Sequence, residues 1–170
     1  MDGYLLDTNI LSYWFDESRP EHSAVKWHVD QPPEAALLWV SAITLGEIEY
    51  GHRCSPTPGV DSQKEFLAFV EKEAPHIADI DKHTATRYGK LRSLLFKRLG
   101  PKSRRQKWPE QLTDPTTAKQ LGIQENDVWI AAQALQFNLV LVSNDKMQHL
   151  KQVASDLRIE NWAIPRQAAY

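Results

Sequence analysis

The amino-acid sequence predicts an α/β fold, specifically a single-domain three-layer α/β/α sandwich with a mostly parallel central sheet. Short apolar runs alternate along the chain with longer segments in which apolar residues recur at helical spacing. The apolar runs are continuous, which is typical of parallel strands that are buried on both faces. A length of 170 residues suits one domain with a substantial core, so we expect one domain over 1–165 and a tail at 166–170.

Local signals predict the individual elements. The run at 3–6 is too short for a helix and predicts a strand, whereas Ile10, Leu11 and Trp14 predict the helix behind it. Ser41 is a good N-cap and starts the helix after the second strand. The other predicted strands are 37–40, 77–80, 139–142 and 157–164, and the other predicted helices are 21–30, 62–74, 125–137, one from Asp81 to about 99 and a short one through 150.

Composition and charge exclude several classes of protein. Apolar residues make up 42% and charged residues 25% of the chain, as in ordinary globular domains, and the net charge is −2. No apolar stretch approaches the roughly 20 residues that span a bilayer, and the N-terminus lacks a signal-peptide pattern, so we expect a cytoplasmic protein without membrane contact. The single cysteine, Cys54, excludes an internal disulfide framework and a cysteine-rich zinc site.

Four carboxylates occupy positions from which they could meet. Asp7 and Asp145 each follow an apolar strand, and the carboxyl ends of parallel strands lie along one edge of a sheet. Asp127 lies in the first turn of the helix before the strand of Asp145, where the helix dipole favours an anion. Glu47 lies nearly two turns into its helix, and its long side chain could reach the same edge. Each acid also has a structural interpretation, as a helix cap, a complement to the helix dipole or, for Glu47, a solvated charge.

Several carboxylates in one pocket repel one another and call for a counter-ion. Oxygen ligands favour Mg²⁺ or Mn²⁺ over zinc, and such an ion suits hydrolysis of a phosphodiester bond by an activated water. The candidate ligands are Asp7, Glu47, Asp127 and Asp145. A longer basic connection at about 100–124 could meet a polyanionic substrate, although a solvated basic loop explains it equally well.

The acids lie in stretches that form a recognisable series. These are Leu6–Asn9, Ser41–Ile48, Asn126–Ala132 and Leu141–Asp145, and they are accompanied by Tyr88–Arg92 and Ile159–Trp162. In this order they resemble the motifs of PIN-domain ribonucleases, and more closely those of the VapC toxins of bacterial type II toxin–antitoxin systems. The resemblance spans nearly the whole chain.

The resemblance implies endonucleolytic cleavage of RNA that depends on Mg²⁺ or Mn²⁺. It also implies a homodimer and a cognate VapB-type antitoxin that inhibits the enzyme near its active site. The family's acidic quartet corresponds to Asp7, Glu47, Asp127 and Asp145, and its supporting polar residues to Thr8, Asn9 and Ser143. Candidates for RNA contact are Arg98, Lys102, Arg104, Arg105 and Lys107.

The chain departs from the family pattern in two places. The connection at about 100–124 is longer than in most relatives and could contact RNA, cover the site, meet the antitoxin or be an insertion without a role. The aromatic residue that usually follows the last aspartate is replaced by Met147, His149 and Leu150. Alternatives to a ribonuclease are a catalytically inactive PIN-fold binding module, a DNA nuclease and a metal-dependent phosphatase, although a dehalogenase-type phosphatase needs an aspartate where the chain has Asn9.

Overall fold

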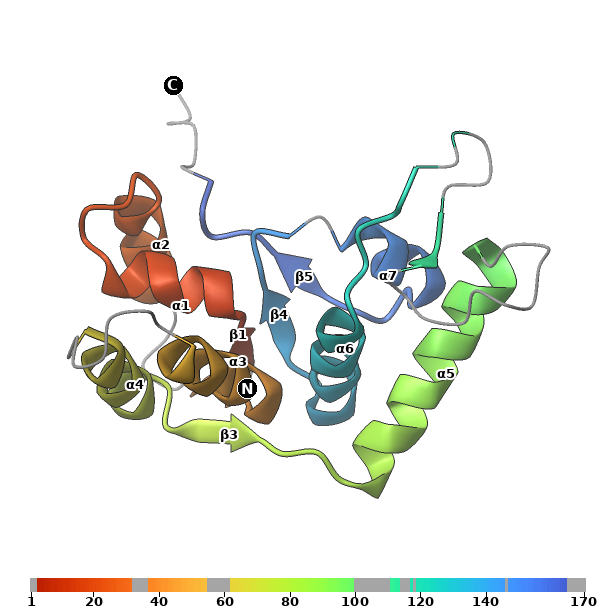
Figure 1. Ribbon diagram of the computed structural model, residues 1–170, viewed down its shortest axis with the longest axis horizontal. Coiled ribbons are helices and arrows are strands. Elements are labelled where there is room, and N and C mark those ends of the chain that lie inside the picture. The colour runs from red at the N-terminus through yellow and green to blue at the C-terminus, as the bar shows by residue number, and fades with distance from the viewer. Residues whose placement is uncertain are drawn as a thin grey trace.

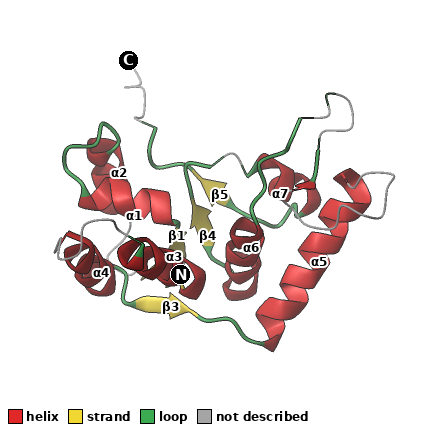
Figure 2. Ribbon diagram, in the orientation of Figure 1, coloured by secondary structure: helices red, strands yellow, loops and turns green. Residues whose placement is uncertain are grey.

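The structure is a computed structural model that describes residues 3–31, 37–54, 62–99, 111–113, 117, 119–145 and 147–164. Within these residues, five strands form one sheet in the order β3-β2-β1-β4-β5, and every pair is parallel. The strands are β1 (Gly3–Leu6), β2 (Leu37–Ser41), β3 (His76–Ala78), β4 (Val140–Val142) and β5 (Ile159–Glu160). The helices are α1 (Thr8–Phe15), α2 (His22–Val29), α3 (Ala42–Arg53), α4 (Ser62–Glu73), α5 (Lys82–Leu99), α6 (Glu125–Phe137) and α7 (Gln148–Val153) (Figures 1 and 2).

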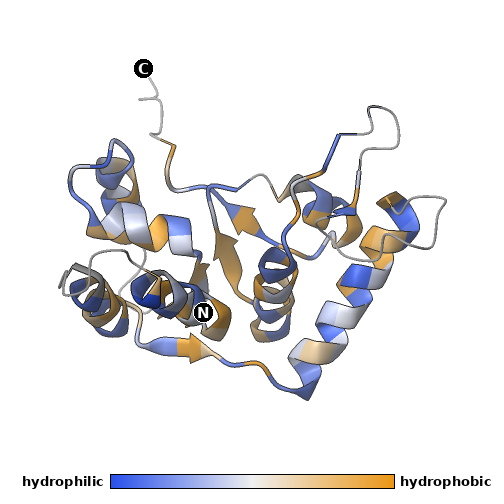
Figure 3. Cartoon of the chain, viewed as in Figure 1, coloured by the Kyte–Doolittle hydropathy of each residue, from blue (hydrophilic) through white to orange (hydrophobic). Residues whose placement is uncertain are grey.

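The helices cover the sheet from two sides, which confirms the predicted α/β/α sandwich. Helices α1 to α4 lie on one side of the central strands, and α5 to α7 lie on the other (Figure 1). Side chains of one strand point alternately into two cores. Leu5 and Leu141 belong to the core under α5–α7, whereas Leu6 and Val142 belong to the core under α1–α4. Figure 3 shows the hydrophobic residues gathered on the strands and on the inner helix faces.

Strand β1 lies at the centre of the sheet and fixes the position of Asp7. Leu6 is in register with Val40 of β2 on one side and with Val142 of β4 on the other. The backbone N–H of Asp7 then donates to the carbonyl of Val142 at 3.0 Å, which continues the ladder by one bond. The residues that follow β1 and β4 therefore meet at one edge of the sheet, as the parallel topology predicts.

Local capping signals correctly predicted several helix ends. The hydroxyl of Ser41 accepts a hydrogen bond from the N–H of Ile43 at 2.9 Å, so it caps α3 as expected. The carboxylate of Asp81 accepts from the N–H groups of His83 and Thr84 at the start of α5, which holds its pKa below the ordinary value. Helix α6 has the bounds that its apolar pattern predicts.

A buried side-chain amide connects helix α6 to the ends of two strands. Gln133 of α6 is fully buried and accepts a hydrogen bond from the hydroxyl of Ser41 at 2.6 Å. Its amide group donates to the carbonyl of Ala78 at 2.5 Å. One side chain therefore connects α6 to the ends of β2 and β3, and it orients the hydroxyl that caps α3.

Two predicted strands are shorter than expected. The third strand is His76–Ala78 and not 77–80, because it pairs only with the last three residues of β2 before the Asp81 cap begins. The fifth is Ile159–Glu160 and not 157–164, because it pairs only with the last two residues of β4, Leu141 and Val142. Tyr50 of α3 is 71% exposed although its side chain is large and aromatic.

The connection at about 100–124 contributes to the core, which its polar sequence did not predict. Leu112 and Ile123 are buried among the residues under α5–α7. An antiparallel bridge pairs the backbone of Thr113 with that of Gln120, so these two positions of the connection lie side by side. The predicted RNA contacts Lys102, Arg104, Arg105 and Lys107 lie outside the described residues, as does the predicted tail at 166–170. Among the helices that the structure describes, none is long and apolar enough to cross a membrane.

Candidate active site

Asp7 lies at the centre of the site, where β1 turns into α1. It is the N-cap of α1, and one carboxylate oxygen accepts from the N–H of Thr8 at 2.8 Å. The other oxygen accepts from the hydroxyl of Ser143 at 2.7 Å. Only 5% of Asp7 is exposed. The side chain therefore fulfils the predicted role of a cap and also lies buried at the carboxyl edge of the sheet.

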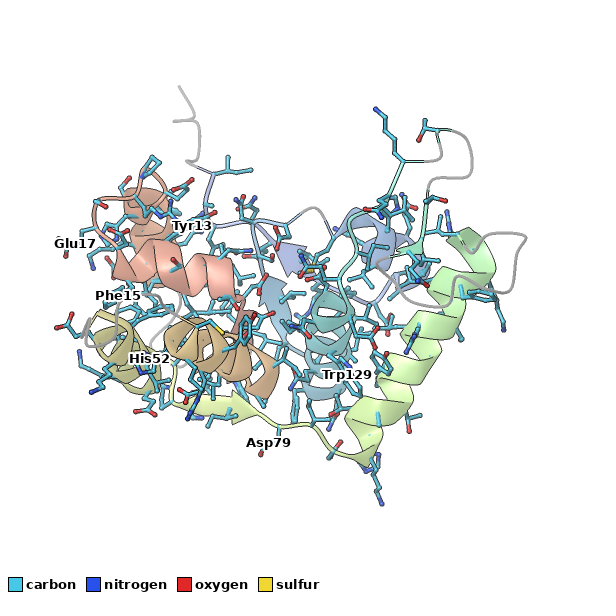
Figure 4. All side chains as sticks on the ribbon, viewed as in Figure 1. Tyr13, Phe15, Glu17, His52, Asp79 and Trp129 are labelled. Atoms are coloured by element: carbon cyan, nitrogen blue, oxygen red, sulfur yellow. The ribbon has the colours of Figure 1, made fainter. Side chains whose placement is uncertain are left out.

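Asn9 connects two of the acids. Its amide group donates to Asp7 at 3.2 Å and to Asp145 at 3.0 Å. Its amide oxygen accepts from the backbone N–H of Asn144 at 3.1 Å, which holds the loop after β4. Asn144 in turn donates to the hydroxyl of Tyr13 on α1, labelled in Figure 4, and accepts from Asn161 at 2.9 Å. A chain of amides thus fixes Asp145 relative to Asp7.

Glu47 joins three helices. One of its carboxylate oxygens accepts from the hydroxyl of Thr8 in the first turn of α1, and the other accepts from the side-chain amide of Asn126 in the first turn of α6, both at 2.6 Å. Glu47 on α3 therefore connects the two helix ends that carry Asp7 and Asp127. Glu49, to which no role was assigned, points elsewhere and pairs with Arg53 at 2.6 Å.

Asp127 lies at the start of α6 and borders a cavity. Its carboxylate accepts from the backbone N–H of Gln124 at 2.9 Å, and the Gln124 side chain accepts from the N–H of Asp127, which completes a capping box. Asp127 and Asp145 both line a cavity of about 270 Å³ whose walls include Met147 and Leu150. Met147 and Leu150 are two of the residues that replace the aromatic side chain expected a few positions after Asp145.

The four acids interact electrostatically. Burial raises the pKa of Asp7, against the opposing effect of its bonds to Ser143 and Thr8, and the charges of Asp145 and Glu47 raise it further. Burial also raises the pKa of Asp127 to about 6, and the charges of the other three acids add to this effect. Among the described residues, no lysine or arginine forms an ion pair with any of the four acids, so within this part of the chain the site is an acidic pocket.

A PIN domain family model matches residues 4–155, which is most of the chain. The chain belongs to the PIN-domain family. It is 30% identical over 162 residues to Ribonuclease VapC2 of Haemophilus influenzae, and this match covers 94% of the chain and 97% of the relative. Ribonuclease VapC of another Haemophilus influenzae strain matches with the same identity and coverage. The resemblance to VapC proteins seen in the sequence motifs is confirmed.

Solved structures agree with this PIN-domain fold. VapBC2 from Rickettsia felis, bound to a DNA fragment from its promoter, matches with a TM-score of 0.69 at 23% identity, covering 94% of this chain and 98% of the other. VapBC-1 from nontypeable Haemophilus influenzae matches with a TM-score of 0.67 at 23% identity, covering 95% and 99%. At this level of identity the likeness concerns the fold.

The donor set of this PIN domain fits a hard divalent cation. The available groups are carboxylate oxygens, and burial together with the charges of the neighbouring acids raises the pKa of Asp7 and Asp127, which a bound cation would oppose. Within the part of the chain that the structure describes, no three acidic, histidine or cysteine side chains converge closely enough to hold a metal ion. Polar side chains bond to the acids instead: Asn9 donates to Asp145, and Thr8 and Asn126 both donate to Glu47.

The structure brings most of the predicted site residues together. Asp7, Glu47, Asp127 and Asp145 lie within electrostatic reach of one another, and Thr8, Asn9 and Ser143 bond directly to these acids. Arg98 is exposed on α5 and donates to the carbonyl of Gln152 on α7, away from this hydrogen-bond network.

Sequence reasoning gave no role to three amides of this network. They are Gln124, Asn126 and Asn144, and two of them immediately precede a site aspartate in the chain. That position, at a strand or helix end beside a predicted ligand, was the available signal. The signal is weak, because asparagine is common at such ends for purely local reasons.

Packing against α5 positions the first turn of α6. Trp129 and Tyr88 stack with ring centroids 3.8 Å apart and an angle of 6° between planes, and Figure 4 shows Trp129 on the α5 side of α6. Arg92 donates to the hydroxyl of Tyr88 at 2.6 Å and pairs with Glu125 at 3.3 Å. The ion pair and the stacked rings hold the helix end that carries Asp127.

Proposed function

We propose that this PIN domain is a divalent-metal-dependent endoribonuclease and the toxin of a toxin–antitoxin pair. The observation that carries the proposal is the acidic pocket at the carboxyl edge of the sheet, where burial and mutual repulsion raise the pKa of Asp7 and Asp127. The relatives named ribonuclease support RNA as the substrate.

The proposed ligands of Mg²⁺ or Mn²⁺ are Asp7, Glu47, Asp127 and Asp145. When bound, such an ion activates a water and neutralises charge on the phosphoryl group. The protein supplies the orientation. Ser143 and Asn9 hold Asp7, and Asn9 also fixes its distance to Asp145. Attack by water on the phosphodiester leaves 5′-phosphate and 3′-hydroxyl ends, and no side chain forms a covalent bond to the substrate.

We also propose a VapB-type antitoxin as the partner of this chain. VapBC structures from Rickettsia felis and Haemophilus influenzae support this proposal through their similar fold. An antitoxin that covers the acidic pocket would keep the enzyme inactive until it is removed. A homodimer belongs to the same proposal, and the mass of the antitoxin-free protein in solution, measured by light scattering, tests it.

Cleavage of a mixed pool of structured RNA tests the proposed activity. The purified, antitoxin-free protein is compared in Mg²⁺, Mn²⁺ and EDTA, with Asp7→Asn and Asp127→Asn as inactivated variants. The matched control is Glu49→Gln, because Glu49 is on the same helix as Glu47 but pairs with Arg53 outside the site. We expect discrete products that require metal, that disappear in both aspartate variants and that persist in the control.

The products and a second substrate discriminate between the alternatives. Ends that carry a 2′,3′-cyclic phosphate would contradict attack by water, because they result from attack by the RNA's own 2′-hydroxyl. Metal-dependent cleavage of DNA in preference to RNA would indicate a DNA nuclease. A folded protein that neither cleaves nor shows a thermal shift with Mn²⁺ would indicate a binding module and would refute the metal site.

A further inference from the structure

Helix α5 has an unusual charge composition. Of its 18 residues six are lysine or arginine and none is acidic, in a protein whose net charge is −2. Five of these cations are exposed, and four of the five lie on one side of the helix: Arg87, Lys90, Lys97 and Arg98. At 3.6 residues per turn they fall within about 100° of arc, and they extend along about 16 Å of the helix axis. We call this set the α5 cationic stripe.

The cations of the stripe form no ion pair with the acids that the structure describes. Among the residues that the structure describes, Arg87, Lys90 and Lys97 form no ion pair and no hydrogen bond through their side chains. Three exposed cations on the other side of the sheet behave differently. Each of the following is paired with a neighbouring carboxylate: Lys26 with Asp30 at 3.3 Å, Arg53 with Glu49 at 2.6 Å and Lys72 with Glu73 at 2.6 Å. The stripe therefore presents positive charge that no described acid neutralises through an ion pair.

The C-terminal turns of α5, which carry Lys97 and Arg98, lie at the end of the domain that contains the acidic pocket. Thr84 in the first turn of α5 bonds to Gln136 near the end of α6, whereas Arg92 pairs with Glu125 at the start of α6. The two helices therefore run in opposite directions, as Figure 1 shows, and the later turns of α5 lie beside the start of α6. Arg98 at the end of the stripe donates to the carbonyl of Gln152 on α7, the helix that follows Asp145.

We propose that the α5 cationic stripe binds the phosphate backbone of the RNA whose cleavage site lies at the four carboxylates. This inference rests on the proposed function, because it takes RNA as the substrate. An acidic pocket repels a polyanion, so binding energy has to come from positive charge outside the pocket. The stripe supplies exposed, unpaired cations for this purpose at the same end of the domain, and counter-ion release from the RNA contributes the driving force.

Salt-dependent binding tests the stripe separately from catalysis. Binding of the full chain to a fluorescein-labelled single-stranded RNA of mixed sequence is measured in EDTA, which prevents metal-dependent cleavage. The variant is Arg87→Ala/Lys90→Ala/Lys97→Ala, which leaves Arg98 in place because it contacts α7. The matched control, Lys26→Ala/Arg53→Ala/Lys72→Ala, removes the same charge from three paired, exposed cations. Circular dichroism melts establish that both variants are folded.

The slope of log K against log salt concentration decides the outcome. Each phosphate contact to a single strand contributes about 0.7 to the magnitude of this slope. Loss of three contacts therefore reduces the magnitude by about 2. We expect this loss in the stripe variant and less than about 0.5 in the control. Equal losses in both variants, or none, would overturn the proposal, as would tighter stripe-dependent binding of duplex DNA. Stripe-dependent RNA binding without cleavage in any metal would refute the nuclease and leave the RNA-binding surface standing.

Discussion

Replacing Asp127 by asparagine is expected to stabilise the metal-free protein at neutral pH, although it removes a proposed metal ligand. Burial and the neighbouring carboxylates raise the pKa of Asp127 from 3.8 to about 6. A carboxyl group whose pKa rises on folding binds protons more tightly in the folded state. The folded state therefore loses stability as the pH rises from about 3.8 to about 6, and the full loss persists above that interval.

The size of the effect follows from the pKa. At about 1.36 kcal/mol for each tenfold change in proton affinity, the ionised carboxylate costs about 3 kcal/mol above pH 6. Solvent screening and coupling to the other acids reduce this to about 2 kcal/mol. Asparagine keeps an oxygen that can accept the Gln124 N–H bond, so the cap of α6 is retained. A gain of about 2 kcal/mol corresponds to a melting temperature higher by about 4–8 °C for a domain of this size.

Urea denaturation in EDTA measures the gain. We expect about 2 kcal/mol at about pH 7.5 and about a third of that at about pH 4.5, where Asp127 is mostly protonated in the folded state. Glu49→Gln, which alters a partly exposed, paired carboxylate, should change the free energy of unfolding by less than about 0.5 kcal/mol. An Asp127→Asn variant that is no more stable than wild type at about pH 7.5, or equally stabilised at both values, would refute the reasoning. Saturating Mn²⁺ should remove the advantage of the variant, because the ion stabilises wild type more strongly.

Three further substitutions test the network around the acids. Asn9→Ala removes the amide that connects two carboxylates, so the Kd for Mn²⁺ in calorimetry should rise by about tenfold or more; an unchanged Kd would contradict this role. Asn126→Ala releases one oxygen of Glu47 and should raise the Mn²⁺ concentration for half-maximal RNA cleavage by about tenfold, whereas an effect on melting temperature alone would indicate a packing role. Gln133→Leu leaves the hydroxyl of Ser41 without its acceptor and should cost about 2–4 kcal/mol in urea denaturation; a loss below about 1 kcal/mol would show that the amide contributes little.

The elements and acids that could be predicted from the sequence are those with local signals. Asp7 follows a short apolar run, Ser41 stands before a helical pattern, and α6 has an uninterrupted apolar face from Glu125 to Phe137. The meeting of the acids at one edge follows from parallel topology, which the strand pattern itself indicates. These inferences need no knowledge of which helices touch.

The parts that escaped prediction depend on tertiary contact. The bond from Asn126 to Glu47 spans 79 positions in the chain, and nothing local indicates it. Leu112 and Ile123 are buried without any periodic pattern around them, because an irregular segment supplies them singly.

The central position of β1 has a consequence for the synthesis of the protein. Strand β1 and Asp7 leave the ribosome well before Ser143, which bonds to Asp7 and lies 136 positions further along. Pairing over such a separation has to wait for the later segment to emerge. Until then Asp7 lacks β4 and its partners at the sheet edge. A chain with this order of strands therefore cannot complete the acidic pocket until β4 and the loop that carries Asp145 have left the ribosome.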